Sequence, residues 1–166
     1  MSKTQPDPGP ATPDTWGEVR SRDQVVRYRR SGAGKTVLLL QAPGKTRPLW
    51  PEVLDVLCAG ARLIEPEPPA AEDEIVPWLT LMLEGLGLVD VTIVALEGFC
   101  MAALERALVD PDRISRIILG CDSRDGMAKL GPEAIARLSA VPLLVIGLDQ
   151  PVKEVVERVA GFMRGR

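Results

Sequence analysis

The sequence contains no histidine, few aromatic residues and no long hydrophobic run. Histidine is the commonest general base near neutral pH and the commonest side-chain ligand of metals, so its absence removes the usual route to both kinds of chemistry. Spanning a bilayer takes about 20 consecutive apolar residues, so the sequence predicts no transmembrane helix, and no apolar segment typical of a signal peptide opens the chain. We expect no metal and no other cofactor.

The cysteines and the net charge narrow the class of protein further. Cys58, Cys100 and Cys121 are odd in number and far apart, which favours buried, reduced thiols over disulfides or a metal site. The net charge of −3 gives no electrostatic reason for binding nucleic acid or an anionic membrane. The 166 residues, 46% of them hydrophobic, suffice for one domain with a sizeable core. These features predict a cytoplasmic protein.

The first fifteen residues differ in composition from the rest of the chain. Residues 1–15 contain four prolines and no apolar cluster. Such a segment buries too little surface to offset the entropy lost on ordering, so we expect a flexible or polyproline-like tail. The domain proper is expected at residues 16–166.

Strands and helices are predicted to alternate after the tail. Two short alternating runs on either side of Arg22-Asp23 predict a β-hairpin with Val26 and Tyr28 facing inward. The strands that follow are uniformly apolar, which is typical of a parallel sheet covered on both faces. The sequence therefore predicts an α/β domain with a mostly parallel sheet of about seven strands and helices on both faces. After the hairpin, the predicted strands are 36–41, 62–65, 91–96, 114–119 and 143–147, and the predicted helices are 50–59, 72–85, 99–108, 132–138 and 152–164.

Two Gly-Lys-Thr triplets, Gly34–Thr36 and Gly44–Thr46, raise the possibility of a phosphate-binding loop. That loop requires another glycine five residues earlier and a position between a strand and a helix. The first triplet precedes its strand, and Arg29 and Leu39 stand where the earlier glycines are needed. We interpret these glycines as turn residues.

Residues 91–104, VTIVALEGFCMAAL, are typical of a strand that enters a helix through a tight corner at Ala95–Phe99. Together with the segments at 25–44, 48–69, 83–120 and 141–166, this order of features resembles the α/β-hydrolase family. The resemblance covers nearly everything after the tail. It implies a nucleophile elbow at Ala95–Phe99 and an oxyanion loop at Gln41, Ala42, Pro43 and Gly44, where the family usually has His-Gly.

The chain departs from this family at the positions that carry catalysis. Ala95 and Phe99 replace the two glycines of the elbow, and Glu97 replaces its serine. The base of the family is a histidine, and this sequence has none. The lid is reduced to residues 121–134, the last strand is absent, and Asp122 and Asp149 near the family's acid positions have no histidine to orient. The sequence favours a catalytically inactive α/β-hydrolase-like protein.

An alternative is a minimal hydrolase or lyase that acts through Glu97. The Ala42–Gly44 loop and the N–H of Gly98 would then stabilise an oxyanion. Glu97 is equally typical of an acid at a helix N-terminus, where the helix dipole favours negative charge. Cys100 is a candidate displaced nucleophile or a packed thiol. Asp122, Asp125 and Glu97 are candidate ligands of a hard cation or ordinary turn and helix-end acids.

The helix at residues 75–86 suggests a protein partner. Its apolar residues cover well over half of the circumference, more than one face of a sheet requires. Trp78 is the largest of them and the residue expected to contact a partner, unless the helix is deeply buried. We expect a homodimer or, as the alternative, a heteromeric complex. Arg27, Arg29, Arg30 and Lys35 form an anion-binding patch or protect the edge of the sheet.

Overall fold

The computed structural model describes residues 14–42, 44, 48–121, 132–137 and 140–165. They form one seven-stranded sheet in the order β1-β2-β4-β3-β5-β6-β7, so the predicted strand number is confirmed. The strands are β1 (Thr15–Arg20), β2 (Val25–Gly32), β3 (Lys35–Leu40), β4 (Ala61–Pro66), β5 (Val91–Leu96), β6 (Ile114–Cys121) and β7 (Leu143–Gly147). The helices are α1 (Pro51–Cys58), α2 (Ile75–Gly85), α3 (Cys100–Val109), α4 (Pro132–Arg137) and α5 (Val152–Arg164), with 3-10 turns η1 (Glu72–Glu74), η2 (Glu97–Phe99) and η3 (Pro111–Arg113).

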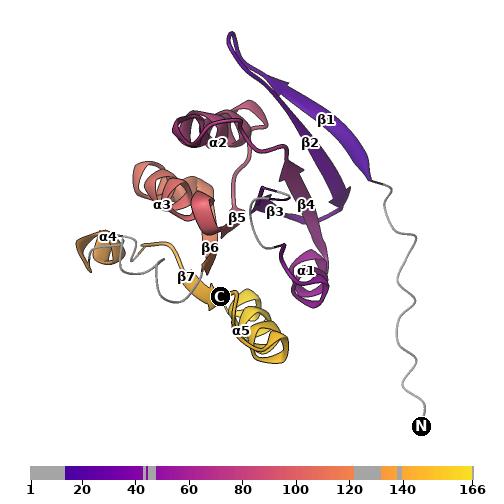
Figure 1. Ribbon diagram of the computed structural model, residues 1–166, viewed down its shortest axis with the longest axis vertical. Coiled ribbons are helices and arrows are strands. Elements are labelled where there is room, and N and C mark those ends of the chain that lie inside the picture. The colour runs from indigo at the N-terminus through magenta and orange to yellow at the C-terminus, as the bar shows by residue number, and fades with distance from the viewer. Residues whose placement is uncertain (1–13, 43, 45–47, 122–131, 138–139, 166) are drawn as a thin grey trace.

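The sheet is antiparallel at one end and parallel through the rest. β2 pairs antiparallel with β1 and with β4, and every pairing from β4 to β7 is parallel. Helices α2, α3 and α4 lie on one face, and α1 and α5 lie on the other (Figure 1). The carboxyl ends of β3, β4 and β5 therefore meet at one edge of the sheet, where ligand sites of α/β proteins commonly lie.

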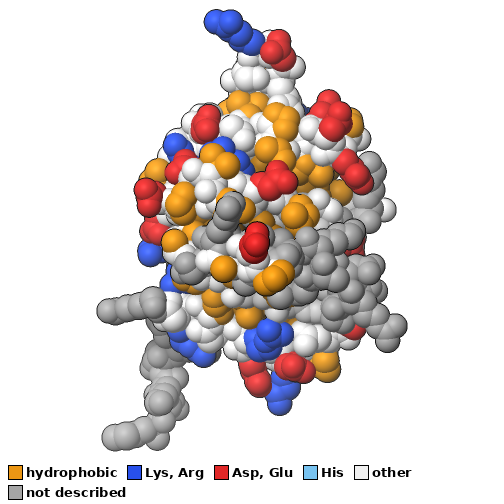
Figure 2. All heavy atoms as spheres, turned by 90° about the vertical axis from the view of Figure 1, so that its left-hand side faces the viewer, with side chains coloured by type: hydrophobic (Ala, Val, Ile, Leu, Met, Phe, Trp, Pro, Cys, Tyr) orange, Lys and Arg blue, Asp and Glu red, His pale blue; other side chains and the backbone are white. Residues whose placement is uncertain are grey.

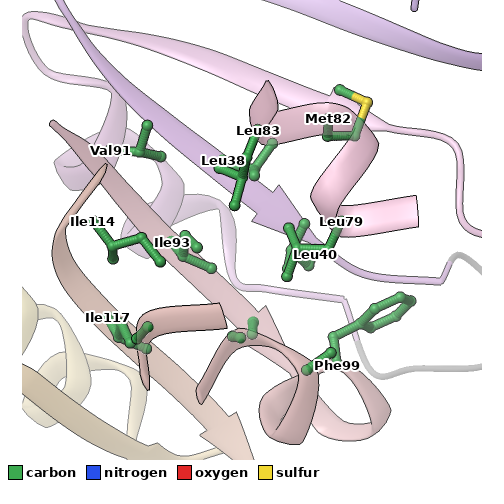
Figure 3. Packing of buried hydrophobic residues seen from close by; sticks show 14 of the residues in the cluster. Leu38, Leu40, Leu79, Met82, Leu83, Val91, Ile93, Phe99, Ile114 and Ile117 are labelled. Carbon is green, nitrogen blue, oxygen red and sulfur yellow. The ribbon is translucent and has the colours of Figure 1, made fainter. Parts of the chain in front are cut away.

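Alternate residues of the central strands pack into two separate cores. Leu38 and Leu40 of β3 point toward Leu79 and Leu83 of α2, as Figure 3 shows. The intervening residues of β3 belong to the core beneath α1 and α5. Both sets are buried, which explains why the buried stretches of these strands are almost entirely apolar.

The N-terminal hairpin has the predicted orientation. Val26 is buried and Tyr28 is half-buried, while Arg27 and Arg29 are exposed. Tyr28 pairs with Gly17, and a Cβ atom at Gly17 would lie 2.5 Å from the Tyr28 ring. The glycine therefore makes room for the aromatic side chain. The predicted tail, residues 1–13, lies outside the described residues.

Of the two alternatives for Trp78, a partner contact or deep burial, the structure shows burial within the domain. Trp78 is 1% exposed, and α2 packs against the sheet, α3 and β1 together. Val19 of β1 lies so close to α2 that its Cγ2 would be 2.3 Å from a Cβ at Gly85. On the side covered by α2 and α3, hydrophobic side chains are interspersed with charged ones (Figure 2). The apolar face of α2 is thus largely covered within the domain, although Val76 is 37% exposed.

The first Gly-Lys-Thr triplet belongs to a turn. Gly32 and Gly34 have φ angles of +73° and +118°, and a Cβ at either would lie less than 3 Å from a backbone oxygen of Gly60 or Ala61. Lys35 opens strand β3 rather than a helix. Residues 45 and 46 of the second triplet lie outside the described residues. Within the described helices, none is long and apolar enough to cross a membrane.

Candidate functional site

The corner after β5 retains the backbone geometry of a nucleophile elbow. β5 ends at Leu96, and Glu97 adopts a φ of +44° at the start of η2. A residue with a Cβ loses roughly 1–2 kcal/mol in this left-handed region. Gly120 of β6 lies behind the corner, and a Cβ there would be 2.5 Å from Leu96 Cδ2. Close packing of β5 on β6 therefore accompanies the strained residue.

The side chains at this corner do not match those of a catalytic elbow. Glu97 is exposed, whereas Cys100 is 8% exposed and its thiol donates to the carbonyl oxygens of Ala95 at 3.4 Å and Gly120 at 3.8 Å. Burial, with smaller contributions from Cys121 and Glu97, raises the pKa of Cys100 to about 12. A thiol with this pKa is protonated at neutral pH, so the structure argues against Cys100 as a nucleophile.

The predicted oxyanion loop is only partly described. Ala42 is buried and forms further interactions, and Gly44 is exposed with a φ of +80°. Pro43 lies outside the described residues. Gly98 is exposed, and a Cβ there would have no atom within 4 Å. Gly44 and Gly98 are therefore both open to solvent. The role of this loop in stabilising an oxyanion stays a prediction.

A cluster of polar side chains lies at the carboxyl ends of β3 and β4. Glu65 accepts hydrogen bonds from Arg29 Nη2 at 2.5 Å and from Gln41 Nε2 at 2.6 Å, one on each carboxylate oxygen. Arg29 faces Glu65 across the β2–β4 pairing, and Gln41 follows β3 directly. The hydrogen bond and the charge of Glu65 raise the pKa of Arg29 above its ordinary value. A carboxylate held from both sides positions its neighbours and is poorly arranged for proton transfer.

The cluster forms one side of a pocket of about 210 Å³. Trp16 supplies an apolar wall, with its side chain 58% exposed, and Arg27 stacks on the Trp16 ring at 5.2 Å from the centroid. The Oε1 atom of Gln41 is buried and accepts no hydrogen bond from the residues that the structure describes. The lining residues are Trp16, Arg29, Gln41, Glu65, Pro66, Glu67 and Pro68. Glu97 is not among them.

The segment after β4 connects the pocket to the core. Glu67 N–H donates to Arg27 O at 2.8 Å, and the Glu67 carbonyl accepts a hydrogen bond from Trp78 Nε1 at 2.9 Å. Trp78 also packs against Phe99 of the elbow, with ring centroids 5.6 Å apart. Trp78 thus lies between the pocket and the elbow as a buried support.

The structure separates the other candidate residues. Arg27 and Arg29 are paired with Glu67 and Glu65, and Lys35 is paired with Asp90, so these residues do not form a shared anion site. Asp122 and Asp125 lie outside the described residues. Within the described part of the chain, no group of three or more His, Cys, Asp or Glu side chains is placed to hold a metal ion.

Six of the seven lining residues were not assigned to a pocket from the sequence: Trp16, Arg29, Glu65, Pro66, Glu67 and Pro68. The signal for Glu65 was its place at the end of a predicted strand, the edge at which ligands bind in α/β folds. The signal for Trp16 was a large aromatic residue at the start of an edge strand. Neither signal identifies a pocket without the strand order.

Known structures share this fold. A CIB-like hydrolase from Thermoplasma acidophilum superposes with a TM-score of 0.65 and 13% identity, covering 92% of this chain and 98% of that one. A haloalkane dehalogenase from Agrobacterium tumefaciens gives a TM-score of 0.53 and 19% identity over 75% of this chain and 47% of that one. An epoxide hydrolase from Vigna radiata gives 0.52 and 18% over 64% and 39%. The chain therefore has an α/β-hydrolase-like fold.

The chain spans less than half the length of that dehalogenase and that epoxide hydrolase, and nearly the full length of the Thermoplasma protein. No protein-family model matches the sequence, and a search of curated proteins found no match. At such low sequence identities, the structural similarity establishes the fold alone, and any activity must be argued from the site.

Proposed function

We propose that this protein is a catalytically inactive, cytoplasmic α/β-hydrolase-like protein that acts as a subunit of an assembly. The observation that carries the proposal is the corner at Glu97: its backbone has the elbow conformation, while glutamate replaces the serine there and the sequence contains no histidine. Three free thiols, Cys58, Cys100 and Cys121, fit a reducing compartment.

The pocket around Trp16 is the proposed contact surface. Its volume of about 210 Å³ is below the roughly 300–1,000 Å³ of sites for drug-sized ligands, which favours a side chain of a protein partner. An exposed tryptophan next to an arginine is typical of an interface hot spot. Trp16 and Arg29 supply such a pair, and the charged residues Asp14, Arg27 and Glu67 supply a polar rim.

Light scattering tests this proposal on the purified chain. We expect a homodimer, with twice the 18.0 kDa of the chain, that returns to a monomer in Trp16→Ala. Truncating a hot-spot tryptophan costs about 2 kcal/mol or more of binding free energy. Val109→Ala, which removes an apolar side chain 73% exposed on α3, is the matched control and should not change the mass. A dimer that persists in Trp16→Ala would place the interface elsewhere.

A heteromeric complex is the alternative if the purified wild type is monomeric. The protein would then be isolated from its own cells as wild type, Trp16→Ala and Val109→Ala. A partner in fixed stoichiometry with wild type and Val109→Ala, and lost with Trp16→Ala, supports the proposed surface. Equal recovery with all three would contradict it.

Catalysis through Glu97 is a second candidate function. One observation favours it: the Glu97 side chain is exposed at the elbow position with a positive φ, the placement that presents a nucleophile. It lacks an identified base, because the chain has no histidine to release a covalent ester.

A further inference from the structure

β7 forms one edge of the sheet in the part of the chain that the structure describes. An edge strand leaves the N–H and C=O groups of alternate residues without a strand partner, and such a row can pair with another chain. Ile117 N–H of β6 donates to Pro142 O, so Pro142 and every second residue after it face β6. The residues whose backbone faces outward are therefore Leu143, Val145 and Gly147.

Two side chains bond to this outward row. Arg158 of α5 donates from Nη2 to Val145 O at 2.8 Å and from Nη1 to Gln150 Oε1 at 3.0 Å. The same Gln150 oxygen accepts the Gly147 N–H at 3.0 Å, and Gln150 N–H donates to Gly147 O at 3.2 Å. The backbone groups that a neighbouring strand would use at Val145 and Gly147 are thus partly occupied by the chain itself.

The position of Arg158 is fixed by the core. Val155 and Val159 of α5 are fully buried beneath the sheet, on the face shared with α1. Arg158 lies between them in sequence, at the border of that buried face, and its long side chain reaches the edge of β7. Replacing Arg158 therefore removes the bonds to the edge without removing the residues that anchor the helix.

We infer that Arg158 and Gln150 close the β7 edge against the addition of a strand from another chain. An incoming strand must displace the guanidinium from Val145 O and break its bond to Gln150. In a symmetric pairing of two copies through β7, it must also bring two Arg158 side chains close together, which like charge opposes. This protection of the β7 edge goes beyond the proposed assembly role and does not depend on it.

The test is Arg158→Ala, with Arg164→Ala on the same helix as the matched control. Arg164 is exposed and lies in the last turn of α5, away from the bonds that Arg158 makes to β7. Light scattering across the micromolar range should show a mass above that of wild type for Arg158→Ala, rising with concentration, and no change for Arg164→Ala. Both variants are also made in the Trp16→Ala background, so that dimerisation at the proposed pocket does not contribute.

A second substitution tests whether the self-association occurs through β7. Leu143 is the first residue of β7 and its N–H faces outward, so proline there removes an edge donor at a position where strands tolerate it. Arg158→Ala with Leu143→Pro should return to the mass of wild type. Gln150→Ala leaves Arg158 in place and should raise self-association less than Arg158→Ala does. If Arg158→Ala does not fold, Gln150→Ala is used to test the inference. A folded Arg158→Ala with unchanged mass, or self-association that survives Leu143→Pro, would overturn the inference.

Discussion

The elbow after β5 and the polar cluster after β3 and β4 lie along the same edge of the sheet, and they are held in different ways. The elbow is a packed structure: Cys100 is buried behind it, Gly120 allows Leu96 to approach, and Glu97 carries a strained φ. The cluster is held by charge and hydrogen bonds between Glu65 and its two donors, and its members are partly exposed.

This difference separates the features of the α/β-hydrolase-like fold that rest on core packing from those that rest on surface charge. Backbone geometry that rests on core packing is maintained by folding stability alone. Side chains at a solvent-facing edge are free to change, and here they line a pocket near the carboxyl ends of β3 and β4. Perturbing packing should therefore affect the elbow, and perturbing charge should affect the cluster.

The largest expected effect is a pH dependence at the elbow. The pKa of Cys100 rises from 9.0 to about 12 on folding, so above pH 9 the unfolded thiol loses its proton while the folded one keeps it. The protonated Cys100 thiol therefore contributes its full stability below pH 9. As the pH rises from 9 toward 12, the free energy of unfolding falls by about 1.4 kcal/mol per pH unit. Urea unfolding at pH 8, 9, 10 and 11 should show wild type losing stability relative to Cys100→Ala. If the stabilities of wild type and Cys100→Ala changed with pH in parallel, folding would not raise the pKa of Cys100.

The next effect comes from two glycines of the same corner. Gly120→Ala places a Cβ 2.5 Å from Leu96 Cδ2 in a fully buried site, and overpacking of this kind costs about 1–3 kcal/mol. Gly98→Ala meets no atom within 4 Å and should leave stability nearly unchanged. Urea unfolding of both variants measures the contrast. Equal effects would mean that close packing behind the elbow is not what the structure indicates.

The cluster should respond to charge and salt with a smaller energy. A double-mutant cycle with Arg29→Met and Glu65→Gln should give a coupling of about 0.5–1 kcal/mol, because the side chains are 44% and 19% exposed and partly screened. The coupling should fall at high salt. The exposed pair Lys35–Asp90, 3.3 Å apart, is the control and should couple more weakly. A stronger coupling in the control pair would remove the distinction between the cluster and ordinary surface charges.

The smallest effect is expected at Glu97. Glycine adopts the left-handed region without the Cβ penalty, although its unfolded state is more flexible. Glu97→Gly should leave the free energy of unfolding level or raise it by up to about 1 kcal/mol. Glu97→Ala keeps the strain and should gain nothing. A clear loss of stability in Glu97→Gly alone would reveal a structural role of the glutamate side chain.

The sequence predicted the elements that depend on local pattern. The bounds of β5, β7 and α5 agree with the predicted ranges, because uniformly apolar runs and an amphipathic terminal helix carry strong local signals. The elbow followed from the resemblance, and the φ of Glu97 confirms its conformation.

The features that depend on tertiary placement were beyond local pattern. The periodicity of α2 shows how wide its apolar face is and cannot show that β1 and α3 cover it, so the sequence left both a partner contact and deep burial open for Trp78. The bond from Arg29 to Glu65 spans 36 residues and exists only through the β2–β4 register. Arg158 likewise reaches Val145 only because α5 packs beside the last strand.

Hydrolysis of short acyl nitrophenyl esters tests whether the elbow at Glu97 carries any catalytic activity. Wild type, Glu97→Gln and Glu97→Ser are compared with buffer under the same conditions. We predict rates equal to buffer for all three, because a carboxylate or a serine at the elbow has no histidine to act as base. Turnover by wild type that disappears in Glu97→Gln would contradict the account and identify Glu97 as a catalytic residue.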